Sequence, residues 1–501
     1  MKRLVTITLI FIVSAFGLDQ SCFGQQRGGV LRMISANFPK NLYPPETGPG
    51  DRIAMLPVAE RLLEWDEDGN IVPILLESWD EDPENNIIIY RLRKGIRFHD
   101  GTPLNAEAMR WNLQMRLEKG RLTEGAKLDR MEVIDEYTLR VFTKMFDVRI
   151  AFNYGFNQMI SPASIEKNGV EWAQSHIVGT GPFKLAEFQR DTYIRYDRND
   201  DYWQKGKPYL DAMENRYIPD PMSAAALIEA GQADVWLTTG AIPQIISLEK
   251  KGFKSVGSPG MFWAILPDTK YADSPFKHKK VREALEYAID RPTLAMLIGQ
   301  GKYEPLHQMA PSGRRAYVKG YNPRPYNPEK AKQLLKEAGY SRGFKTTLMA
   351  RSGALDAVSA MKFYLAAVGI DVKLDIADLG RYFGSLFGTG WKGLIFAASG
   401  IDPDSGDIFI HFGPYPLTYR TGNIYKSPEY LAAANEALQE FDTAKRIKLI
   451  QKMVRLGGED AMIIPIYRSY EANVMAKYVH SDYPKIHNAL WHPQNDWMER
   501  H

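Results

Sequence analysis

Residues 73–109 constrain most strongly how this 501-residue chain folds. Apolar residues recur at every second position within this stretch: Ile88, Tyr90 and Leu92. That period predicts a strand with one buried face, and Asp100-Gly101 then predicts a tight turn. Asn105 has a side chain suited to cap a helix whose apolar residues fall at four-residue spacing: Met109, Leu113 and Leu117. The stretch is therefore predicted to be a hairpin that leads into an amphipathic helix.

Length and composition indicate a globular protein of two or three domains. The chain is 45% hydrophobic and 25% charged, and 501 residues exceed what one hydrophobic core normally serves. Lys and Arg number 63 against 60 Asp and Glu, a net charge of +3. This balance argues against nucleic acid or an anionic membrane as partner, and no run after residue 16 reaches transmembrane length. We expect neither partner, and no direct membrane insertion.

The N-terminus has the order of residues typical of a secretory signal. Lys2 and Arg3 precede an apolar run over residues 4–16, which is too short to span a bilayer comfortably. Cleavage is predicted after Gly17 or Gly24, and Gly24 is preferred because the chain turns polar immediately afterwards. We therefore expect an exported, periplasmic protein.

The single cysteine, Cys22, lies within this predicted signal. A lipoprotein signal requires an apolar residue three positions before the cysteine, and Asp19 stands there, so we expect no lipid anchor. Cleavage after Gly24 leaves a mature chain without thiols, which excludes disulfides and cysteine chemistry.

The middle and later parts of the chain read as α/β. Residues 51–61 predict a helix. V-G-T-G-P-F-K-L over residues 178–185 contains a G-x-G but lacks the helix start that a phosphate site needs, so a domain crossing is predicted instead. Beyond Gly260, helices alternate with short apolar strands, which predicts a sheet that is at least partly parallel. The predicted strands there are residues 344–350, 370–376, 394–398 and 461–467.

Three motifs occur in a fixed order along the chain. They are the hairpin-helix block, V-G-T-G-P-F-K-L, and F-K-H-K-K-V-R-E-A-L-E-Y-A-I-D-R followed by G-Q-G-K-Y-E-P. Together they resemble extracellular solute-binding protein family 5, the peptide- and nickel-type periplasmic binding proteins of ABC importers. The resemblance covers essentially everything after the predicted signal. It implies an α/β, two-lobed periplasmic-binding-protein-like fold of the large peptide-binding type, with an extra α+β subdomain in the first lobe.

The resemblance also implies a division of the chain into segments. We expect a signal peptide (1–24), lobe I in three segments (25–48, 179–259 and 469–501), the extra subdomain of lobe I (49–178), and lobe II (260–468). The hinge is predicted near Ser258-Pro259-Gly260 and near Arg468.

The function implied is binding without chemistry. In such proteins two lobes close over a solute, and only the closed form docks productively on the membrane permease. We therefore expect a monomer that binds a small solute, with peptide first, delivers it to ABC permease subunits, and needs no cofactor. A sensory or chaperone role for the same closing motion stays open.

Ligand contacts are expected from both sides of the predicted hinge. Asn37 and Tyr43 lie in the loop after the first strand and are the candidates on lobe I. Trp263 lies just beyond the hinge, and it is equally a candidate for a ligand contact and for a core aromatic.

The candidates on lobe II lie within residues 391–407, W-K-G-L-I-F-A-A-S-G-I-D-P-D-S-G-D. A strand there ends in a loop with three carboxylates, and open α/β sheets bind ligands at the carboxyl ends of their strands. The predicted contacts are Trp391, Ser399, Asp402 and Asp404. The aspartates, including Asp407, are equally interpretable as an Asp-Pro turn with helix caps.

Ser399 raises a question about the ligand. Peptide-binding members of the family that this chain resembles carry at the matching position an Asp that pairs with the α-ammonium of the peptide. A neutral hydroxyl cannot supply that charge-assisted bond. Either Asp402 takes over the role, or the ligand is not a free-amino peptide but an oligosaccharide, an opine or another solute.

Two other classes of function are less well supported by the sequence. The histidines nearest to a cluster, His480, His487 and His492, lack zinc-site spacing, so no metal site is predicted, although a haem or nickel complex as ligand stays open. A secreted hydrolase would need a carboxylate pair such as Asp402 and Asp407. Because no H-E-x-x-H motif accompanies that pair, and the predicted mature chain has no cysteine nucleophile, we do not expect an enzyme.

Overall fold

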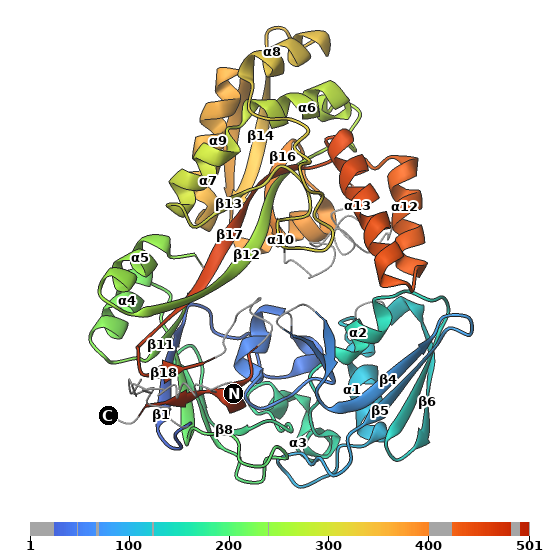
Figure 1. The fold of residues 1–501 in the computed structure, drawn as a ribbon, viewed down its shortest axis with the longest axis vertical. Helices are drawn as coiled ribbons and strands as arrows, with labels where there is room; N and C mark the ends of the chain where they lie inside the picture. Colours follow the sequence, from blue (N-terminus) through green and yellow to red (C-terminus); the bar gives the residue numbers. More distant parts are fainter. Residues whose placement is uncertain are drawn as a thin grey trace, which may run out of the picture.

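The computed structural model describes residues 25–47, 49–66, 70–122, 125–238, 240–399, 423–481 and 491–499. Within these ranges, one sheet of 11 strands runs through both lobes in the order β15-β14-β16-β12-β17-β11-β1-β10-β9-β8, with β13 paired to β17 (Figure 1). Its strands are β1 (Val30–Ser35), β8 (Phe183–Gln189), β9 (Tyr193–Arg198), β10 (Ala212–Tyr217), β11 (Val235–Thr238), β12 (Lys254–Pro267), β13 (Glu304–Pro305), β14 (Phe344–Arg351), β15 (Ile370–Ala377), β16 (Leu394–Ser399) and β17 (Ile464–Met475).

The two long strands β12 and β17 form a neck between the lobes (Figure 1). On the lobe II side β12 also pairs with β16 from Phe262 onward, and on the lobe I side β17 also pairs with β11 from Ala472 onward. Between these points the two strands pair mainly with each other, and their register shifts after Pro259, as at a β-bulge. The predicted hinge positions lie in this stretch, and the domain boundaries themselves stay predictions.

The extra subdomain has a sheet of its own, of 4 strands in the order β4-β5-β7-β6. Its elements are β4 (Leu76–Asp82), β5 (Ile87–Leu92), β6 (Leu128–Asp135), β7 (Thr138–Thr143), α1 (Ala106–Glu118), α2 (Ile150–Gly155) and α3 (Pro162–Ala173). The predicted strand and helix are confirmed: Ile88, Tyr90 and Leu92 are buried, and the Asn105 side chain accepts a hydrogen bond from Ala108 N at the start of α1. Short strands β2 (Leu63–Trp65) and β3 (Ile71–Pro73) pair beside it.

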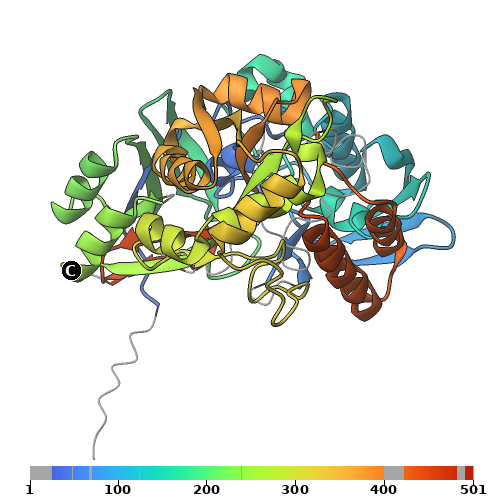
Figure 2. The same ribbon diagram turned by 90° about the horizontal axis from the view of Figure 1, so that it is seen from above.

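Helices cover the main sheet in both lobes. Lobe I has α4 (Pro221–Glu229) and α5 (Ile242–Lys250). Lobe II has α6 (Lys279–Ala288), α7 (Arg291–Gly299), α8 (Pro328–Glu337), α9 (Leu355–Ala367), α10 (Leu379–Gly384), α12 (Pro428–Gln439) and α13 (Thr443–Glu459). Strand β14 pairs in parallel with both β15 and β16, which confirms the partly parallel sheet predicted for this half of the chain. In both views, α12 and α13 lie on the opposite side of the molecule from α4 and α5 (Figure 1 and Figure 2).

The helix predicted over residues 51–61 is wrong. The structure has a 3-10 helix there, η2 (Pro49–Met55), and then an irregular segment. The carbonyl oxygens of Pro57 and Val58 accept hydrogen bonds from Phe183 N and Gly181 N, at 3.0 and 2.8 Å. These tertiary bonds use backbone groups that a longer helix would have used internally.

The two glycines of V-G-T-G-P-F-K-L explain this close contact. A Cβ atom at Gly179 would lie 2.1 Å from the carbonyl oxygen of Val58, and one at Gly181 would lie 2.5 Å from that of Pro57. The motif therefore brings two backbone segments together. Thr180, between the glycines, donates a hydrogen bond of 2.9 Å to the buried carboxylate of Glu60.

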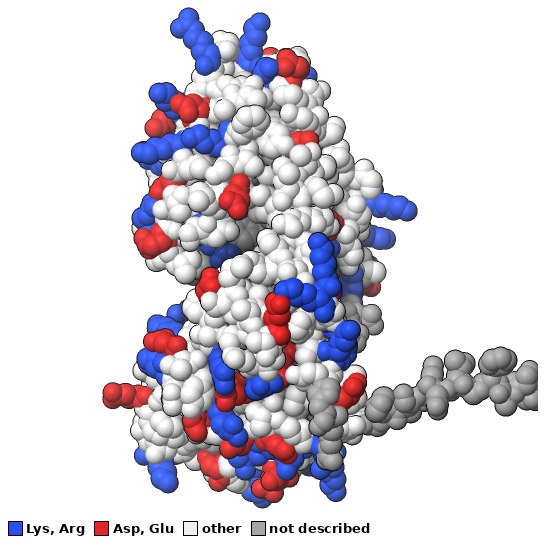
Figure 3. All heavy atoms as spheres, turned by 90° about the vertical axis from the view of Figure 1, so that its left-hand side faces the viewer, with Lys and Arg blue, Asp and Glu red and all other residues white. Residues whose placement is uncertain are grey.

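The face shown in Figure 3 is hollowed between the two lobes, and positive and negative side chains are interspersed over it. No helix within the described ranges is long and apolar enough to cross a membrane.

Candidate ligand cleft

The carboxyl ends of the three parallel strands of lobe II meet at one edge of the sheet. Strand β14 ends at Arg351, β15 at Ala377 and β16 at Ser399, and Arg351 pairs with Ala377 in register. Ser399 pairs with Phe262 at the neck end of β12. This edge therefore faces the gap between the lobes, where open α/β sheets bind ligands.

Trp263 and Arg351 form an aromatic-cation pair at this edge. The Trp263 ring stacks on Phe396 with centroids 5.0 Å apart, and it lies 6.2 Å from the ring of Tyr467. The guanidinium carbon of Arg351 lies 5.0 Å from the Trp263 ring centroid, within cation–π range. Trp263 is 8% exposed and belongs to the core of lobe II, so its packing is settled, whereas its predicted ligand contact stays a prediction.

Arg351 is half-buried, and no carboxylate of the described residues lies within ion-pair distance of its guanidinium. A half-buried cation at a strand end is a candidate receptor for a ligand anion. Arg351 is not among the ligand contacts predicted from the sequence. The strand-end rule applied to residues 391–407 would have found it, because Arg351 directly follows the strand predicted over residues 344–350.

Trp391 lies at the other end of β16 from Ser399. It is 3% exposed, its indole Nε1 donates to the carbonyl of Leu266 at 3.2 Å, and its own carbonyl accepts from Asn423 Nδ2 at 2.7 Å. These contacts fasten the start of β16 to β12. The structure does not bring Trp391 together with Ser399, and the predicted ligand contact of Trp391 gains no geometric support.

The two candidates on lobe I differ in accessibility. Asn37 is exposed in the loop that follows β1. Tyr43 is 0% exposed, and burial raises the pKa of its phenol to about 12. Its hydroxyl has no hydrogen-bond partner among the described residues. Tyr43 thus packs in the core of lobe I rather than facing solvent.

The predicted carboxylates Asp402, Asp404 and Asp407 lie outside the described residues, as does His487. Their roles stay predictions. Of the other histidines, His480 stacks on Trp497 at 3.8 Å and pairs with Glu499 at 2.8 Å. The parts of the chain that the structure describes contain no group of three His, Cys, Asp or Glu residues able to hold a metal ion.

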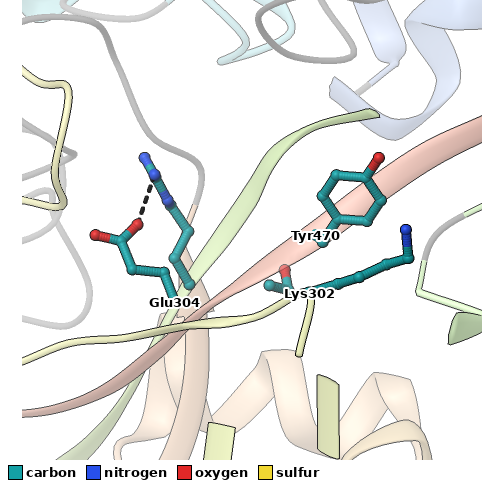
Figure 4. Close-up of a pocket in the computed structure, with 5 residues that line it drawn as sticks. Lys302, Glu304 and Tyr470 are labelled. Atoms are coloured by element: carbon teal, nitrogen blue, oxygen red, sulfur yellow. Dashed lines mark ion pairs between the residues drawn. The ribbon is translucent and has the colours of Figure 1, made fainter. Parts of the chain in front are cut away.

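A pocket of about 140 Å³ lies at the neck, lined by Lys302, Glu304, Arg468, Ser469 and Tyr470 (Figure 4). Arg468 Nη2 and Glu304 Oε2 form an ion pair at 2.5 Å, while Lys302 lies 5.0 Å from the Tyr470 ring centroid and pairs with Glu249 of α5 at 2.8 Å. Burial lowers the pKa of Arg468, and Glu304 opposes that shift. Because Arg468 and Lys302 each pair with an acidic residue, we interpret these ion pairs as structural contacts of the neck.

Two α/β lobes joined by a two-strand neck, with polar strand ends facing the gap, define a two-lobed solute-binding protein. A family model described as bacterial extracellular solute-binding proteins, family 5, matches residues 70–414. The chain belongs to this family, which confirms the resemblance found in its motifs.

Relatives and solved structures agree with this assignment. The glutathione-binding protein GsiB of Escherichia coli O157:H7 is 30% identical over 421 residues, which cover 80% of this chain and 81% of GsiB. The periplasmic binding protein DppA from Helicobacter pylori, in complex with the peptide STSA, superposes with a TM-score of 0.82 at 24% identity, covering 95% of this chain and 99% of DppA. AgaA from A. tumefaciens R10, in complex with agropinic acid, gives a TM-score of 0.79 at 23% identity, covering 94% and 99%. The two structures show the shared fold, so the predicted two-lobed architecture is confirmed.

Proposed function

We propose that this protein is the exported binding component of an ABC importer, which closes its lobes on a peptide or peptide-like solute and delivers it to the membrane permease. The relative GsiB is named for binding glutathione, a tripeptide, and this supports a short peptide as ligand. The family is extracellular, and together with the N-terminal sequence this supports a periplasmic protein whose signal is removed near Gly24 and which lacks a lipid anchor. Binding, without catalysis, is the proposed activity.

The proposal rests on the position of Arg351 at the end of β14. Its guanidinium is held over Trp263 and pairs with no carboxylate of the described residues. A planar guanidinium binds a carboxylate through two parallel hydrogen bonds, and the partial burial at this position strengthens such a pair. We infer that Arg351 receives a carboxylate of the solute. The Trp263 ring restricts the guanidinium before the ligand arrives, which reduces the ordering cost of binding.

For the other end of the solute, we propose the contacts that were predicted from the sequence. Asp402, beyond the end of β16, is proposed to pair with a ligand ammonium in place of the Asp that Ser399 replaces, and Asn37 and Asp404 are proposed as polar contacts. Ser399 also favours a second candidate, an acidic solute without a free ammonium. The fold is shared with AgaA, whose structure contains agropinic acid.

A thermal-shift screen of the protein, stripped of bound ligand by unfolding and refolding, tests the proposal. The panel holds di- and tripeptides, glutathione, their N-acetylated and C-amidated forms, agropinic acid and oligosaccharides. A ligand at about 100 times its Kd stabilises the folded state by about 2.7 kcal/mol. We expect a shift with free-acid peptides that C-amidation abolishes. Loss of the shift on N-acetylation as well would assign an ammonium partner, whereas a response to oligosaccharides alone would contradict the peptide proposal.

A further inference from the structure

The extra subdomain contacts lobe II on the side of the molecule away from the neck. Val148 N–H donates a hydrogen bond of 3.0 Å to the carbonyl of Leu438, and the rings of Phe146 and Phe441 lie 6.1 Å apart at an interplanar angle of 60°. In Figure 1, α12 and α13 reach down beside α2, which begins just after Val148. These contacts therefore join the lobes at the point where opening about the neck would separate them furthest.

The hydrogen bond from Val148 satisfies a backbone carbonyl at the C-terminal end of α12. Leu438 lies in the last turn of α12, where carbonyl groups have no partner within the helix. Leu438 is 1% exposed, so its carbonyl depends on a nearby donor, and the subdomain provides one. Separation of the lobes removes this donor and exposes the end of α12.

The subdomain half of the contact is held in place by charges within its own lobe. Asp147, between Phe146 and Val148, is 1% exposed and forms ion pairs with Lys127 and, at 2.7 Å, with Arg149 Nη2. Its Oδ1 also accepts a hydrogen bond of 3.0 Å from Arg149 N. All of these contacts lie within lobe I, so none of them requires lobe II.

The lobe II half of the contact is held by hydrogen bonds from Arg446 within its own lobe. Arg446 Nη1 donates to the carbonyls of Glu440 and Phe441 at 3.0 and 3.1 Å, and its Nη2 donates to Thr443 Oγ1 at 3.0 Å. Phe441 is nevertheless 55% exposed, so little of its surface is needed by the core of lobe II. A preformed, partly exposed aromatic is available to contact a partner surface at small entropic cost.

We propose that residues 146–148 of the extra subdomain and residues 438–441 of lobe II form a clasp that stabilises the closed arrangement of the lobes without ligand. One further contact between the subdomain and lobe II acts in the same direction: Arg315 Nη2 donates to Asn70 Oδ1 at 2.7 Å. The clasp gives the subdomain a function, which is to shift the open–closed equilibrium toward the closed form. This consequence rests on the proposed binding function, because a larger closed fraction raises the affinity for any solute that selects that form.

Distance measurements on the ligand-free protein test the clasp. Spin labels at Ile134→Cys, on the subdomain, and Lys362→Cys, on lobe II, are placed in a Cys22→Ser background, so that the introduced thiols are the only ones. The protein is stripped of ligand by unfolding and refolding, and electron–electron resonance gives the closed and open populations. Because no solute is present, failure of the peptide panel does not affect this measurement.

Phe441→Ala is expected to lower the ratio of closed to open molecules about 2- to 10-fold, the value of one aromatic pair. Phe363→Ala is the matched control, because Phe363 is 75% exposed on α9 of the same lobe, and it should leave the ratio unchanged. The double variant Phe441→Ala/Val148→Pro, which also removes the N–H donor, should open the protein further. Distributions identical to the parent in both Phe441 variants, or a parent that is entirely open, would overturn the proposal.

Discussion

Gly179→Ala should destabilise the protein severely, because the space for a methyl group is occupied by backbone. A Cβ atom at Gly179 would lie 2.1 Å from the carbonyl oxygen of Val58 and 2.7 Å from Cα of Ala59. A tolerable carbon–oxygen contact is about 3.3 Å, so the two segments must separate by about 1 Å. No flexible side chain can yield instead.

The magnitude follows from what that separation disturbs. Overpacking of a core costs about 1–3 kcal/mol when side chains can rearrange, and the upper end applies where backbone must move. The separation also strains the 2.8 Å hydrogen bond from Gly181 N to the Val58 carbonyl, which contributes about 1 kcal/mol. We therefore expect a loss of about 4 kcal/mol. For an unfolding unit of a few hundred residues this corresponds to a fall in Tm of about 8 °C.

Scanning calorimetry, with urea unfolding followed by tryptophan fluorescence, measures this loss. Gly384→Ala is the matched control: Gly384 is exposed with helical dihedral angles (φ −58, ψ −43), and an added Cβ atom meets nothing within 4 Å. That substitution should stabilise by about 0.5–1 kcal/mol. A Gly179→Ala protein within about 1 kcal/mol of the parent would refute the account of the motif.

Three further substitutions test buried groups and the neck. Burial raises the pKa of Glu60 to about 7, so the folded carboxyl binds its proton more tightly than the unfolded one. The free energy of unfolding should therefore fall by about 3 kcal/mol as pH rises from 5 to 8. Glu60→Gln should flatten that pH dependence in urea titrations. Burial acts to raise the pKa of Asp147, but the charges of Arg149 and Lys127 outweigh it and lower that pKa to about 2. Asp147→Asn should therefore lower the free energy of unfolding by about 3–5 kcal/mol at pH 7. This difference from the parent should shrink as pH falls toward 2. At the neck, a Cβ atom at Gly257 would lie 1.8 Å from the hydroxyl of Tyr470, so Gly257→Ala should destabilise alone, and a double-mutant cycle with Tyr470→Ala should recover most of the loss. Additive effects in that cycle would contradict direct packing of the ring on Gly257.

Local patterns in the sequence were enough to predict much of this architecture. The period of two at Ile88 and Tyr90 and the cap at Asn105 identified β5 and α1, because burial of one face and satisfaction of helix-end N–H groups are local requirements. The helix over residues 51–61 failed for the opposite reason. Its carbonyls are used by Gly181 and Phe183, more than a hundred residues away, and no local pattern records that pairing.

The candidate site is harder to predict from the sequence, because it is assembled from separate strands. The rule that open α/β sheets bind ligands at the carboxyl ends of their strands selected Ser399, and the same rule applied to β14 selects Arg351 as a further candidate. It did not distinguish the two ends of β16, so Trp391, at the start of the strand, was included although it is fastened to Leu266 in the core. Tyr43 was chosen for its position in a loop, but its side chain turns inward. Only tertiary packing decides such orientations.

Isothermal titration of a free-acid peptide and its C-terminal amide tests the role of Arg351 in ligand binding most directly. The proteins compared are the parent, Arg351→Met, which keeps an apolar stem over Trp263, and Arg342→Met, which changes an exposed arginine just before the other end of β14. A charge-assisted hydrogen bond contributes about 1.5–3 kcal/mol, so amidation should weaken binding about 10- to 100-fold in the parent and in Arg342→Met. In Arg351→Met, acid and amide should bind alike. An equal effect of amidation in all three proteins, or no binding of any peptide, would contradict the proposal that this protein closes on a peptide whose carboxylate Arg351 receives.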